Sequence, residues 1–281
     1  AETAYQNSLA YCKERKQGKS NDNKNNETDL IIKHADIRRS LMTMKSLIEG
    51  QRSLAFWLSQ QVDVSLNHSN DQIRKEADDM VSLMTPVVKS FFSDTGMEIT
   101  NEAIQVFGGY GYTRDQGSEQ LYRDNRITPI YEGTNSVQAI DLVFRKVLAN
   151  KILDKFINLV RNEIANNKNN KELKEFIEIL EKKIIILQHF AKWLEEKLKV
   201  QKDDVSAACN DFLKVLSYVA LGFSWLKMTK ISYENLNKNK HFYDEKINTA
   251  KYFFDKIFPR VDSHYQSAIA GSESIMKAKF N

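Results

Sequence analysis

The feature of this chain that most constrains its fold is the scarcity of residues that interrupt helices. Among 281 residues there are 3 prolines and 10 glycines, and six of those glycines lie between Gly96 and Gly133. Because proline and glycine disfavour helix interiors more than other residues, the rest of the chain is free to form long helices. We therefore predict an all-α fold, and the length suits two compact domains.

The composition is that of an ordinary globular protein. Hydrophobic residues make up 42% of the chain and charged residues 28%. The net charge is only +4, and basic residues alternate with acidic ones along the chain. This pattern disfavours a nucleic-acid surface, although the slight basic excess leaves a DNA-associated function open. No run reaches the roughly 18 apolar residues that span a bilayer, so no membrane partner is expected.

The cysteines bear on the cellular location of the protein, and the first residues bear on whether the chain is part of a larger one. Cys12 and Cys209 lie far apart without CxxC spacing, so a reduced, cytoplasmic location is the simplest interpretation, and no metal site is predicted. The chain starts at Ala1 with neither an initiator Met nor a signal peptide. We expect it to be the C-terminal portion of a larger protein.

The first 150 residues carry apolar side chains at helical spacing. Residues 1–16 are expected to end a helix, and the polar stretch 17–27 to form a loop. In the long helix that follows, apolar residues recur at steps of three, four or seven: Ile37, Leu41, Met44, Ile48, Ala55 and Leu58. Short connections between such helices predict an up-and-down bundle.

The next helix has a clear start signal and two expected irregularities. Asn70 or Asp71 suits the N-cap, and Pro86 predicts a kink because proline lacks the backbone N–H. The inward-facing residues are expected to be Ile73, Ala77, Met80, Met84, Val87 and Phe91. Residues 95–96 predict a break, which leaves a separate short helix over 99–107.

A glycine-rich block follows. Residues 108–112 are predicted to form a loop, and their three glycines would let a backbone approach a pyrophosphate or a neighbouring chain. A simple turn is the commoner explanation of such a block. A short helix over 115–125, a loop over 129–133 and a helix over 136–148 are expected next.

Beyond residue 150 a second helical bundle is predicted. Residues 166–170 form a turn, and a seam typical of a long helix packed along another one follows: Leu173, Ile177, Leu180, Ile184, Leu187, Ala191, Leu194 and Leu198. Further helices are expected over about 205–233 and 245–257, and after Pro259 over about 261–278. No catalytic constellation stands out in this half.

The loop before the 136–148 helix carries a carboxylate, Glu132, between Tyr131 and Gly133. A carboxylate that abstracts a carbon-bound proton works best when it is partly removed from water. On chemistry alone, a solvated loop residue or a helix-start residue favoured by the helix dipole explains Glu132 better.

Four short motifs occur in a fixed order within the first 150 residues. They are Glu14-Arg15-Lys16-Gln17, Gln105 with Gly108-Gly109, Leu121-Tyr122-Arg123-Asp124, and Tyr131-Glu132-Gly133-Thr134. In this order they resemble the ERKQ, QxxGG, LYRD and YEGT segments of the acyl-CoA dehydrogenase family. The resemblance covers residues 1 to about 150.

The resemblance implies an FAD-dependent enzyme that oxidises an acyl-CoA thioester to the 2,3-enoyl-CoA. Glu132 matches the family's base, which removes the α-proton while the β-hydrogen leaves as hydride to FAD. The matching cofactor-binding positions are Arg15, Gln105, Gly108, Gly109, Thr134 and Ser136, and the substrate-binding positions are Tyr131 and Gly133. Arg15, Gln105 and Gly109 match positions that reach the FAD of a neighbouring subunit, whereas Thr134 and Ser136 match positions that touch the flavin of their own subunit.

The same resemblance implies partners and domains. It implies a homodimer or homotetramer and an electron-transferring flavoprotein or similar acceptor, with no nucleic acid or membrane. His34 matches a position near the adenosine, although a surface helix cap explains it better. Residues 1–150 would be the catalytic helical domain, and residues 151–281 resemble the helical extension of the long, methylthio-propionyl-CoA dehydrogenase-like subgroup.

The family's N-terminal helical domain and β-barrel domain are not in these 281 residues. The alternative function is therefore a truncated, catalytically incompetent helical interaction module derived from such an enzyme.

Overall fold

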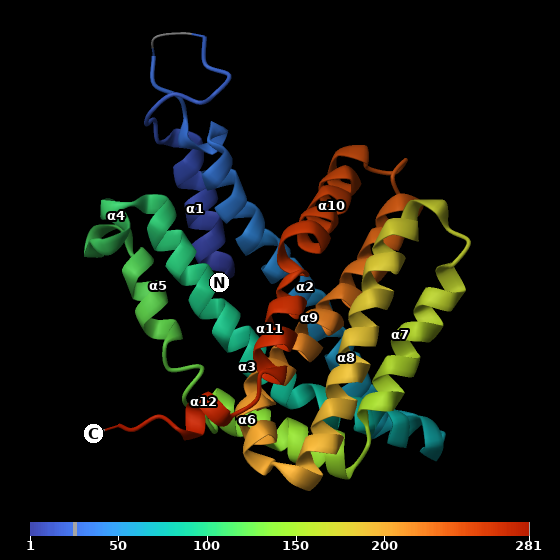
Figure 1. Ribbon diagram of the computed structural model, residues 1–281. Helices are drawn as coiled ribbons and strands as arrows, with labels where there is room; N and C mark the ends of the chain where they lie inside the picture. The colour runs from blue at the N-terminus through green and yellow to red at the C-terminus, as the bar shows by residue number, and fades with distance from the viewer. Residues whose placement is uncertain (25–26, 281) are drawn as a thin grey trace. The chain divides into compact units, whose positions relative to one another are not determined.

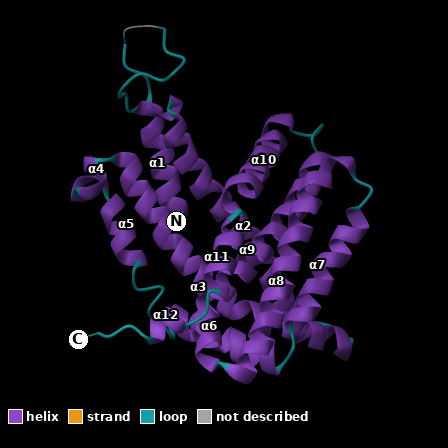
Figure 2. Ribbon diagram, viewed as in Figure 1, coloured by secondary structure: helices purple, strands orange, loops and turns teal. Residues whose placement is uncertain are grey.

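The computed structural model describes residues 1–24 and 27–280, and this part of the chain consists mainly of helices joined by loops (Figures 1 and 2). Two residues of the predicted 17–27 loop and the last residue of the predicted second domain lie outside it. The α-helices are α1 (Glu2–Glu14), α2 (Ala35–Asn67), α3 (Asp71–Phe107), α4 (Gly109–Tyr112), α5 (Ser118–Asn125), α6 (Asn135–Asp141), α7 (Leu153–Asn167), α8 (Lys174–Val200), α9 (Lys202–Glu234), α10 (Lys240–Tyr252), α11 (Arg260–Ile269) and α12 (Glu273–Met276).

Shorter helical pieces join these helices. Three 3₁₀ turns, Ile31–Lys33, Arg114–Gln116 and Lys171–Leu173, precede α2, α5 and α8, and π-helical segments extend α6 (Leu142–Ala149) and α10 (Phe253–Ile257). The β-structure of the described residues is one isolated antiparallel bridge between Lys16 and Leu30. The predicted all-α fold is confirmed.

The helices form two compact units that do not follow the order of the chain. The first unit comprises residues 1–49 and 92–131, and the second comprises residues 50–91 and 132–281. The long helices α2 and α3 therefore each contribute one part to each unit. The predicted division of the sequence at residue 150 stays a prediction.

The core of the first unit is built by α1 and by the parts of α2 and α3 that belong to it. Its buried side chains include Cys12, Leu41, Met44, Leu47, Ile99, Ala103 and Val106. Tyr11 of α1 stacks on Phe107 at the end of α3, with ring centroids 4.3 Å apart. This stack fixes the end of α1 beside the glycine-rich block that follows Phe107.

The predicted break at residues 95–96 is wrong, because α3 continues through both. A Cβ atom on Gly96 would lie 2.8 Å from the side-chain nitrogen of Asn125, at the end of α5. Gly96 therefore permits a close approach of α5 rather than ending a helix. The sequence pattern could not distinguish these two uses of glycine.

The second unit is organised around α9. Residues 215–226 are buried without interruption, as expected for a helix with neighbours on all sides. The elements that contact α9 include α6, α8, α10 and α11. A Cβ atom on Gly222 would lie 2.7 Å from the ring of Phe258, so glycine is needed there for close contact.

Several expectations for the second unit are confirmed. The seam of α8 packs along α9, and six of its eight predicted residues are buried: Leu173, Ile177, Leu180, Ile184, Leu187 and Leu194. The other two, Ala191 and Leu198, are half-buried. The N-cap of α3 is Asn70, whose side-chain oxygen accepts hydrogen bonds from the backbone N–H groups of Gln72 (2.9 Å) and Ile73 (3.2 Å). The helix then runs through Pro86.

Three details of the second unit differ from the expectations. Ile73 lies in the first turn of α3 and is 40% exposed, so it is not part of the buried stripe. The predicted helix over 261–278 is interrupted after Ile269, where Gly271 adopts a φ of +79°. The helix α7 was not predicted.

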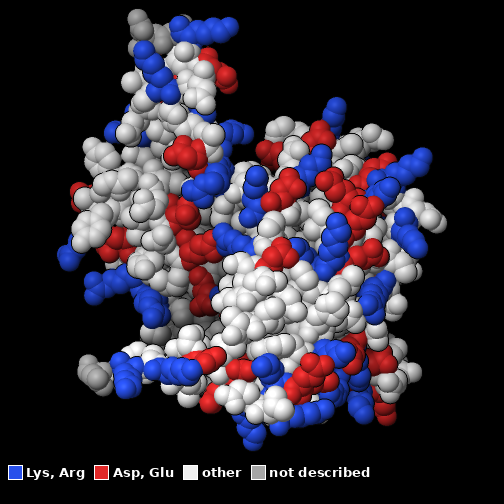
Figure 3. Space-filling model, viewed as in Figure 1, with Lys and Arg blue, Asp and Glu red and all other residues white. Residues whose placement is uncertain are grey.

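The two cysteines are free, and both are buried. Burial raises the pKa of the Cys12 thiol to about 11 and that of Cys209 to about 12. Within the described residues, no helix combines the length and apolarity that a membrane crossing requires. Over the second unit, basic and acidic side chains are interspersed on the face seen in Figure 3.

Candidate functional site

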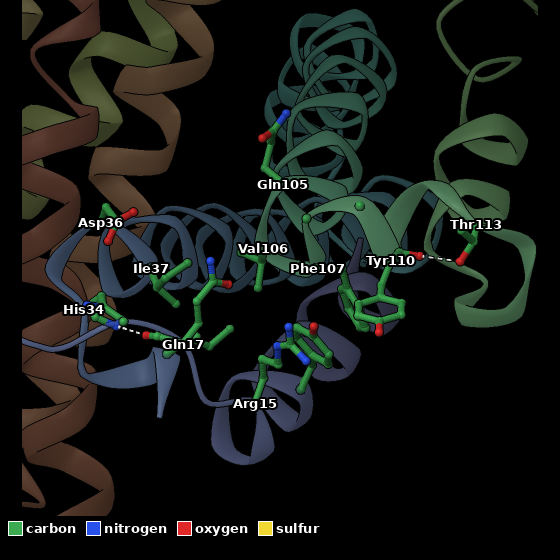
Figure 4. Close-up of a pocket in the computed structure, with 15 residues that line it drawn as sticks. Arg15, Gln17, His34, Asp36, Ile37, Gln105, Val106, Phe107, Tyr110 and Thr113 are labelled. Atoms are coloured by element: carbon green, nitrogen blue, oxygen red, sulfur yellow. Dashed lines mark hydrogen bonds between the residues drawn. The ribbon is translucent and has the colours of Figure 1, made fainter. Parts of the chain in front are cut away.

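A pocket in the first unit brings together four of the predicted cofactor-binding residues. Its volume is about 780 Å³, which is within the range of about 300–1,000 Å³ typical of small-molecule sites. Arg15 and Gln17 line it from the segment after α1, His34 and Asp36 from the start of α2, and Gln105, Gly108, Gly109 and Tyr110 from the end of α3 and the start of α4 (Figure 4). Three segments of the chain therefore meet at this pocket, and the last of them is far from the other two in sequence.

Arg15 is positioned by the way in which α1 ends. It is the C-cap of α1, where its backbone turns to an extended conformation. Its carbonyl oxygen accepts a hydrogen bond of 2.8 Å from the N–H of Ile31, and the N–H of Gln17 donates to the backbone carbonyl oxygen of Asp29 (2.9 Å). This ladder of two backbone hydrogen bonds keeps the segment after α1 in an extended conformation. The Arg15 guanidinium lies 5.5 Å from the ring centre of Tyr110. Figure 4 shows both side chains.

Asp29 anchors the loop that carries this ladder. Its carboxylate accepts hydrogen bonds from the side chains of Lys33 (2.8 Å) and Asn23 (2.6 Å), and from the backbone N–H (2.9 Å) and hydroxyl (2.7 Å) of Ser20. These donors, Lys33 foremost, hold the pKa of the Asp29 carboxyl well below its usual range. Through these hydrogen bonds the Asp29 carboxylate fixes the loop that leads into Ile31, the residue hydrogen-bonded to Arg15.

The glycines at the pocket differ in what surrounds them. A Cβ atom added to Gly108 or Gly109 would meet nothing within 4 Å, whereas one on Gly111 would lie 2.6 Å from the backbone oxygen of Ile104. Gly108 also has a φ of +61°, which disfavours other residues. The predicted loop over 108–112 is partly wrong, because residues 109–112 form one turn of helix. Gly109 faces open space that an approaching ligand can use.

His34 belongs to the same pocket. Its Nε2 atom lies 2.7 Å from the carbonyl oxygen of Gln17 (Figure 4). A Cβ atom on Gly18 would meet the His34 ring at 3.6 Å. The ring therefore packs against the loop after α1, a position that the interpretation as a surface helix cap missed.

The charges and donors of this pocket suit an anionic ligand. A guanidinium, two glutamine amides and a glycine backbone open to the pocket are the groups that bind phosphates well. One carboxylate, that of Asp36, also lines the pocket and opposes an anion close to it. The residues present fit a phosphate-bearing nucleotide cofactor, whose phosphates Arg15 would hold.

The predicted base lies in the second unit, in the loop that enters α6. Glu132 has a φ of +54° and Gly133 one of +82°, so two successive residues adopt left-handed backbone conformations. Thr134 is the N-cap of α6, and its hydroxyl accepts from the N–H of Val137 at 3.4 Å. Helix α6 then carries Ser136, whose hydroxyl lies 3.4 Å from the side-chain nitrogen of Asn210 on α9.

Side chains from two helices hold this loop. Lys89 of α3 donates to the carbonyl oxygen of Gly133 at 2.7 Å and to the side chain of Asn135 at 2.9 Å. The amide of Gln138 donates to the carbonyl oxygen of Glu132 at 3.0 Å. Sequence reasoning missed Lys89 and Gln138. No sequence signal marked Lys89, which is one of many lysines, but Gln138 lies one helical turn after Thr134.

Glu132 is exposed, and Tyr131, the last residue of the first unit, retains 50% of its surface. The second unit by itself therefore does not supply the removal from water that a carbon-acid base needs. Glu132, Thr134 and Ser136 come from one loop and helix of the second unit, whereas the pocket around Arg15 consists of residues of the first unit.

Comparison with known proteins identifies the class to which these elements belong. The family described as "Acyl-CoA dehydrogenase, C-terminal domain" matches residues 1–148, and "Acetyl-CoA dehydrogenase C-terminal like" matches residues 154–279. The first match covers more than half of the chain. The chain belongs to the acyl-CoA dehydrogenase family.

Individual relatives agree. The 3-methylmercaptopropionyl-CoA dehydrogenase of Ruegeria pomeroyi is 40% identical over 148 residues, which are 53% of this chain and 25% of that protein. A butyryl-CoA dehydrogenase of Syntrophomonas wolfei is 28% identical over 98% of this chain and 45% of its own length. The chain thus spans about half the length, or less, of the curated relatives that it matches.

A solved structure shares the fold. The acyl-CoA dehydrogenase of Bacillus anthracis complexed with FAD superimposes with a TM-score of 0.74, at 18% identity, over 98% of this chain and 47% of that one. At this identity the likeness concerns the fold alone.

Proposed function

We propose that this chain contributes the catalytic base and part of the cofactor site of an FAD-dependent acyl-CoA dehydrogenase. The substrate is an acyl-CoA thioester and the product is the 2,3-enoyl-CoA. The observation that carries the proposal is the pocket in which Arg15, Gln105, Gly108 and Gly109 meet. The family resemblance selects these residues without reference to their position in space.

In the proposed reaction the carboxylate of Glu132 accepts the α-proton of the acyl group. The electron pair of that C–H bond becomes part of the new double bond, and the β-hydrogen leaves as hydride. Hydrogen bonds to the thioester carbonyl oxygen make the α-proton acidic enough for a carboxylate. Bound FAD supplies the acceptor for the hydride.

The residues of the chain divide between cofactor and substrate. Arg15 binds the pyrophosphate with charge-assisted hydrogen bonds, while Gln105, Gly108 and Gly109 line its surroundings. Thr134 and Ser136 contact the flavin, and Tyr131 and Gly133 contact the substrate beside Glu132. Arg15, Gln105 and Gly109 serve the FAD of a neighbouring subunit, so the enzyme acts as a homodimer or homotetramer. An electron-transferring flavoprotein or similar acceptor reoxidises it.

The division into a catalytic region, 1–150, and a helical extension, 151–281, follows from the same proposal. The extension packs against α6 through α9 and supports subunit contacts. The names of the relatives support short acyl-CoA thioesters as the first substrates to examine, butyryl-CoA and 3-methylmercaptopropionyl-CoA among them.

The test is Glu132→Gln in the FAD-loaded holoenzyme, mixed anaerobically with butyryl-CoA while flavin absorbance is followed. Because glutamine keeps the size of the side chain but cannot accept the proton, flavin reduction should slow by about 10²–10⁴-fold or more. The content of bound FAD should equal that of the wild type. Reduction at the wild-type rate would reject Glu132 as the base.

A non-catalytic helical interaction module is the competing function, and the exposure of Glu132 favours it. Colour distinguishes the two. The purified protein should be yellow and show a flavin spectrum after FAD has been added and the excess removed. A colourless protein that binds no FAD would support the interaction module.

A further inference from the structure

We infer that Lys89 and Gln138 are positioning residues, which set the backbone of the Glu132 loop and thereby the direction of its carboxylate. This inference rests on the proposed function of Glu132. Neither residue belongs to the four motifs that carry the family resemblance.

The two side chains hold two successive carbonyl groups. Gln138 donates to the carbonyl oxygen of Glu132 at 3.0 Å, and Lys89 donates to that of Gly133 at 2.7 Å. The donors come from different elements, because Gln138 lies on α6 and Lys89 on α3. The peptide groups that follow Glu132 and Gly133 are therefore each fixed from a different side.

This bracing matters because the loop has an unfavourable backbone conformation. A φ of +54° is uncommon for a glutamate, and the Gly133 that follows lies in the same region. Residues held in such conformations persist only where the surrounding structure determines them. Without these hydrogen bonds, the backbone of Glu132 would relax toward the right-handed helical or extended conformations, and its side chain would point in another direction.

A third contact makes the link to α3 reciprocal. Asn135 accepts from Lys89 at 2.9 Å and donates through its amide nitrogen to the carbonyl oxygen of Ser90 at 3.1 Å. One turn of α3 thus both donates to and accepts from the start of α6. Lys89 is partly buried. Its hydrogen bond to Asn135 is partly buried, whereas its hydrogen bond to Gly133 is exposed.

The exposure of Glu132 fits this role. Its direction is not set by burial of the carboxylate within the second unit, so the backbone has to set it. A misplacement of about 1 Å in a reacting group can cost about 10²-fold in rate. Two side chains that fix the adjoining carbonyls are a direct way to avoid that loss.

The test compares Lys89→Met and Gln138→Met with Lys155→Met in the FAD-loaded holoenzyme. Methionine keeps approximate length and removes the donor. Lys155 is a matched control, because it is a lysine of the second unit that also bonds to α3, through Asp79, away from the loop. Glu132→Gln is measured beside them.

Three quantities are measured for each variant: FAD content, the dissociation constant of butyryl-CoA, and the limiting rate of flavin reduction. Lys89→Met and Gln138→Met should lower the limiting rate about 10- to 100-fold, with FAD content and butyryl-CoA affinity unchanged. Deuterium at the α-carbon should slow them more than it slows the wild type. Amide hydrogen exchange over residues 132–138 should quicken in these variants and not in Lys155→Met.

The outcomes separate the two proposals. Normal flavin reduction by Glu132→Gln would reject the proposed function, and the inference with it. An inactive Glu132→Gln together with wild-type rates and exchange in Lys89→Met would overturn the inference and leave the function standing. Should Lys89→Met fail to fold, Gln138→Met decides: a wild-type rate with intact FAD overturns the inference, and a reduced rate supports it.

Discussion

Gly109 and Gly111 lie two residues apart, yet the structure requires glycine at only one of them. A Cβ atom at position 111 would lie 2.6 Å from the backbone oxygen of Ile104, and a backbone atom cannot easily give way. At position 109 the same atom would enter open space at the mouth of the pocket. Gly111 is therefore required for folding, whereas Gly109 borders open space at the pocket.

Alanine should therefore affect stability at position 111 and FAD binding at position 109. Gly111→Ala should lower the free energy of unfolding by about 1–3 kcal/mol because of the forced contact. Gly109→Ala should leave that free energy unchanged and weaken FAD binding. Urea unfolding and fluorimetric FAD titration measure the two quantities. Tight FAD binding by Gly109→Ala would remove Gly109 from the cofactor site.

Among the elements, the turn between α11 and α12 is held by one buried carboxylate of α9. Asp204 accepts from the N–H (2.8 Å) and hydroxyl (2.7 Å) of Ser272 and pairs with Lys197 at 2.7 Å. Lys197, followed by Ser272, lowers the pKa of Asp204 from 3.8 to about 2. A C-terminal segment is thereby tied to the central helix of the second unit.

This pKa sets the sign of a pH effect. Because the folded pKa is depressed, the stabilisation by Asp204 is complete above its unfolded pKa of 3.8 and is lost as the pH falls through about 2. Asp204→Asn should therefore be less stable than the wild type at pH 6, and the gap should close between pH 4 and pH 2. Urea titrations at each pH measure it. A gap that is independent of pH would contradict the charge-based account.

The elements also show how far the sequence alone can go. Periodic apolar spacing located α2, the part of α3 up to Phe91, and α8, since a buried stripe leaves a direct pattern. Glycine was ambiguous, because Gly96 accommodates Asn125 inside α3, whereas Gly271 ends α11. The motifs selected the residues of the pocket, but the contacts of Lys89 depend on folding and leave no local signal.

At the scale of the whole molecule, the proposed function places Glu132 and Arg15 of one chain in different active sites of an oligomer. Under the proposed function, Glu132 would serve the flavin of its own subunit, and Arg15 would serve that of its neighbour. An Arg15 variant should therefore weaken FAD binding while leaving Glu132 of each site intact. A Glu132 variant should prevent proton removal while leaving Arg15 of each site intact.

Mixed oligomers should recover activity. When Arg15→Ala and Glu132→Gln subunits are co-expressed, some sites should combine the intact Glu132 of one subunit with the intact Arg15 of the other. Flavin reduction should then exceed that of either variant alone. The control carries both substitutions on one chain beside a wild-type partner. If the mixed oligomer shows no gain, Arg15 and Glu132 of one subunit serve the same site, which would contradict the proposal.

The central claim is that Glu132 removes the α-proton, and α-proton exchange tests it most directly. Acetyl-CoA has an α-carbon but no β-hydrogen, so it isolates the proton step. The FAD-loaded holoenzyme in D₂O should incorporate deuterium into the acetyl methyl group, and Glu132→Gln should incorporate none above the uncatalysed rate. Equal deuterium incorporation by the two proteins would contradict the account.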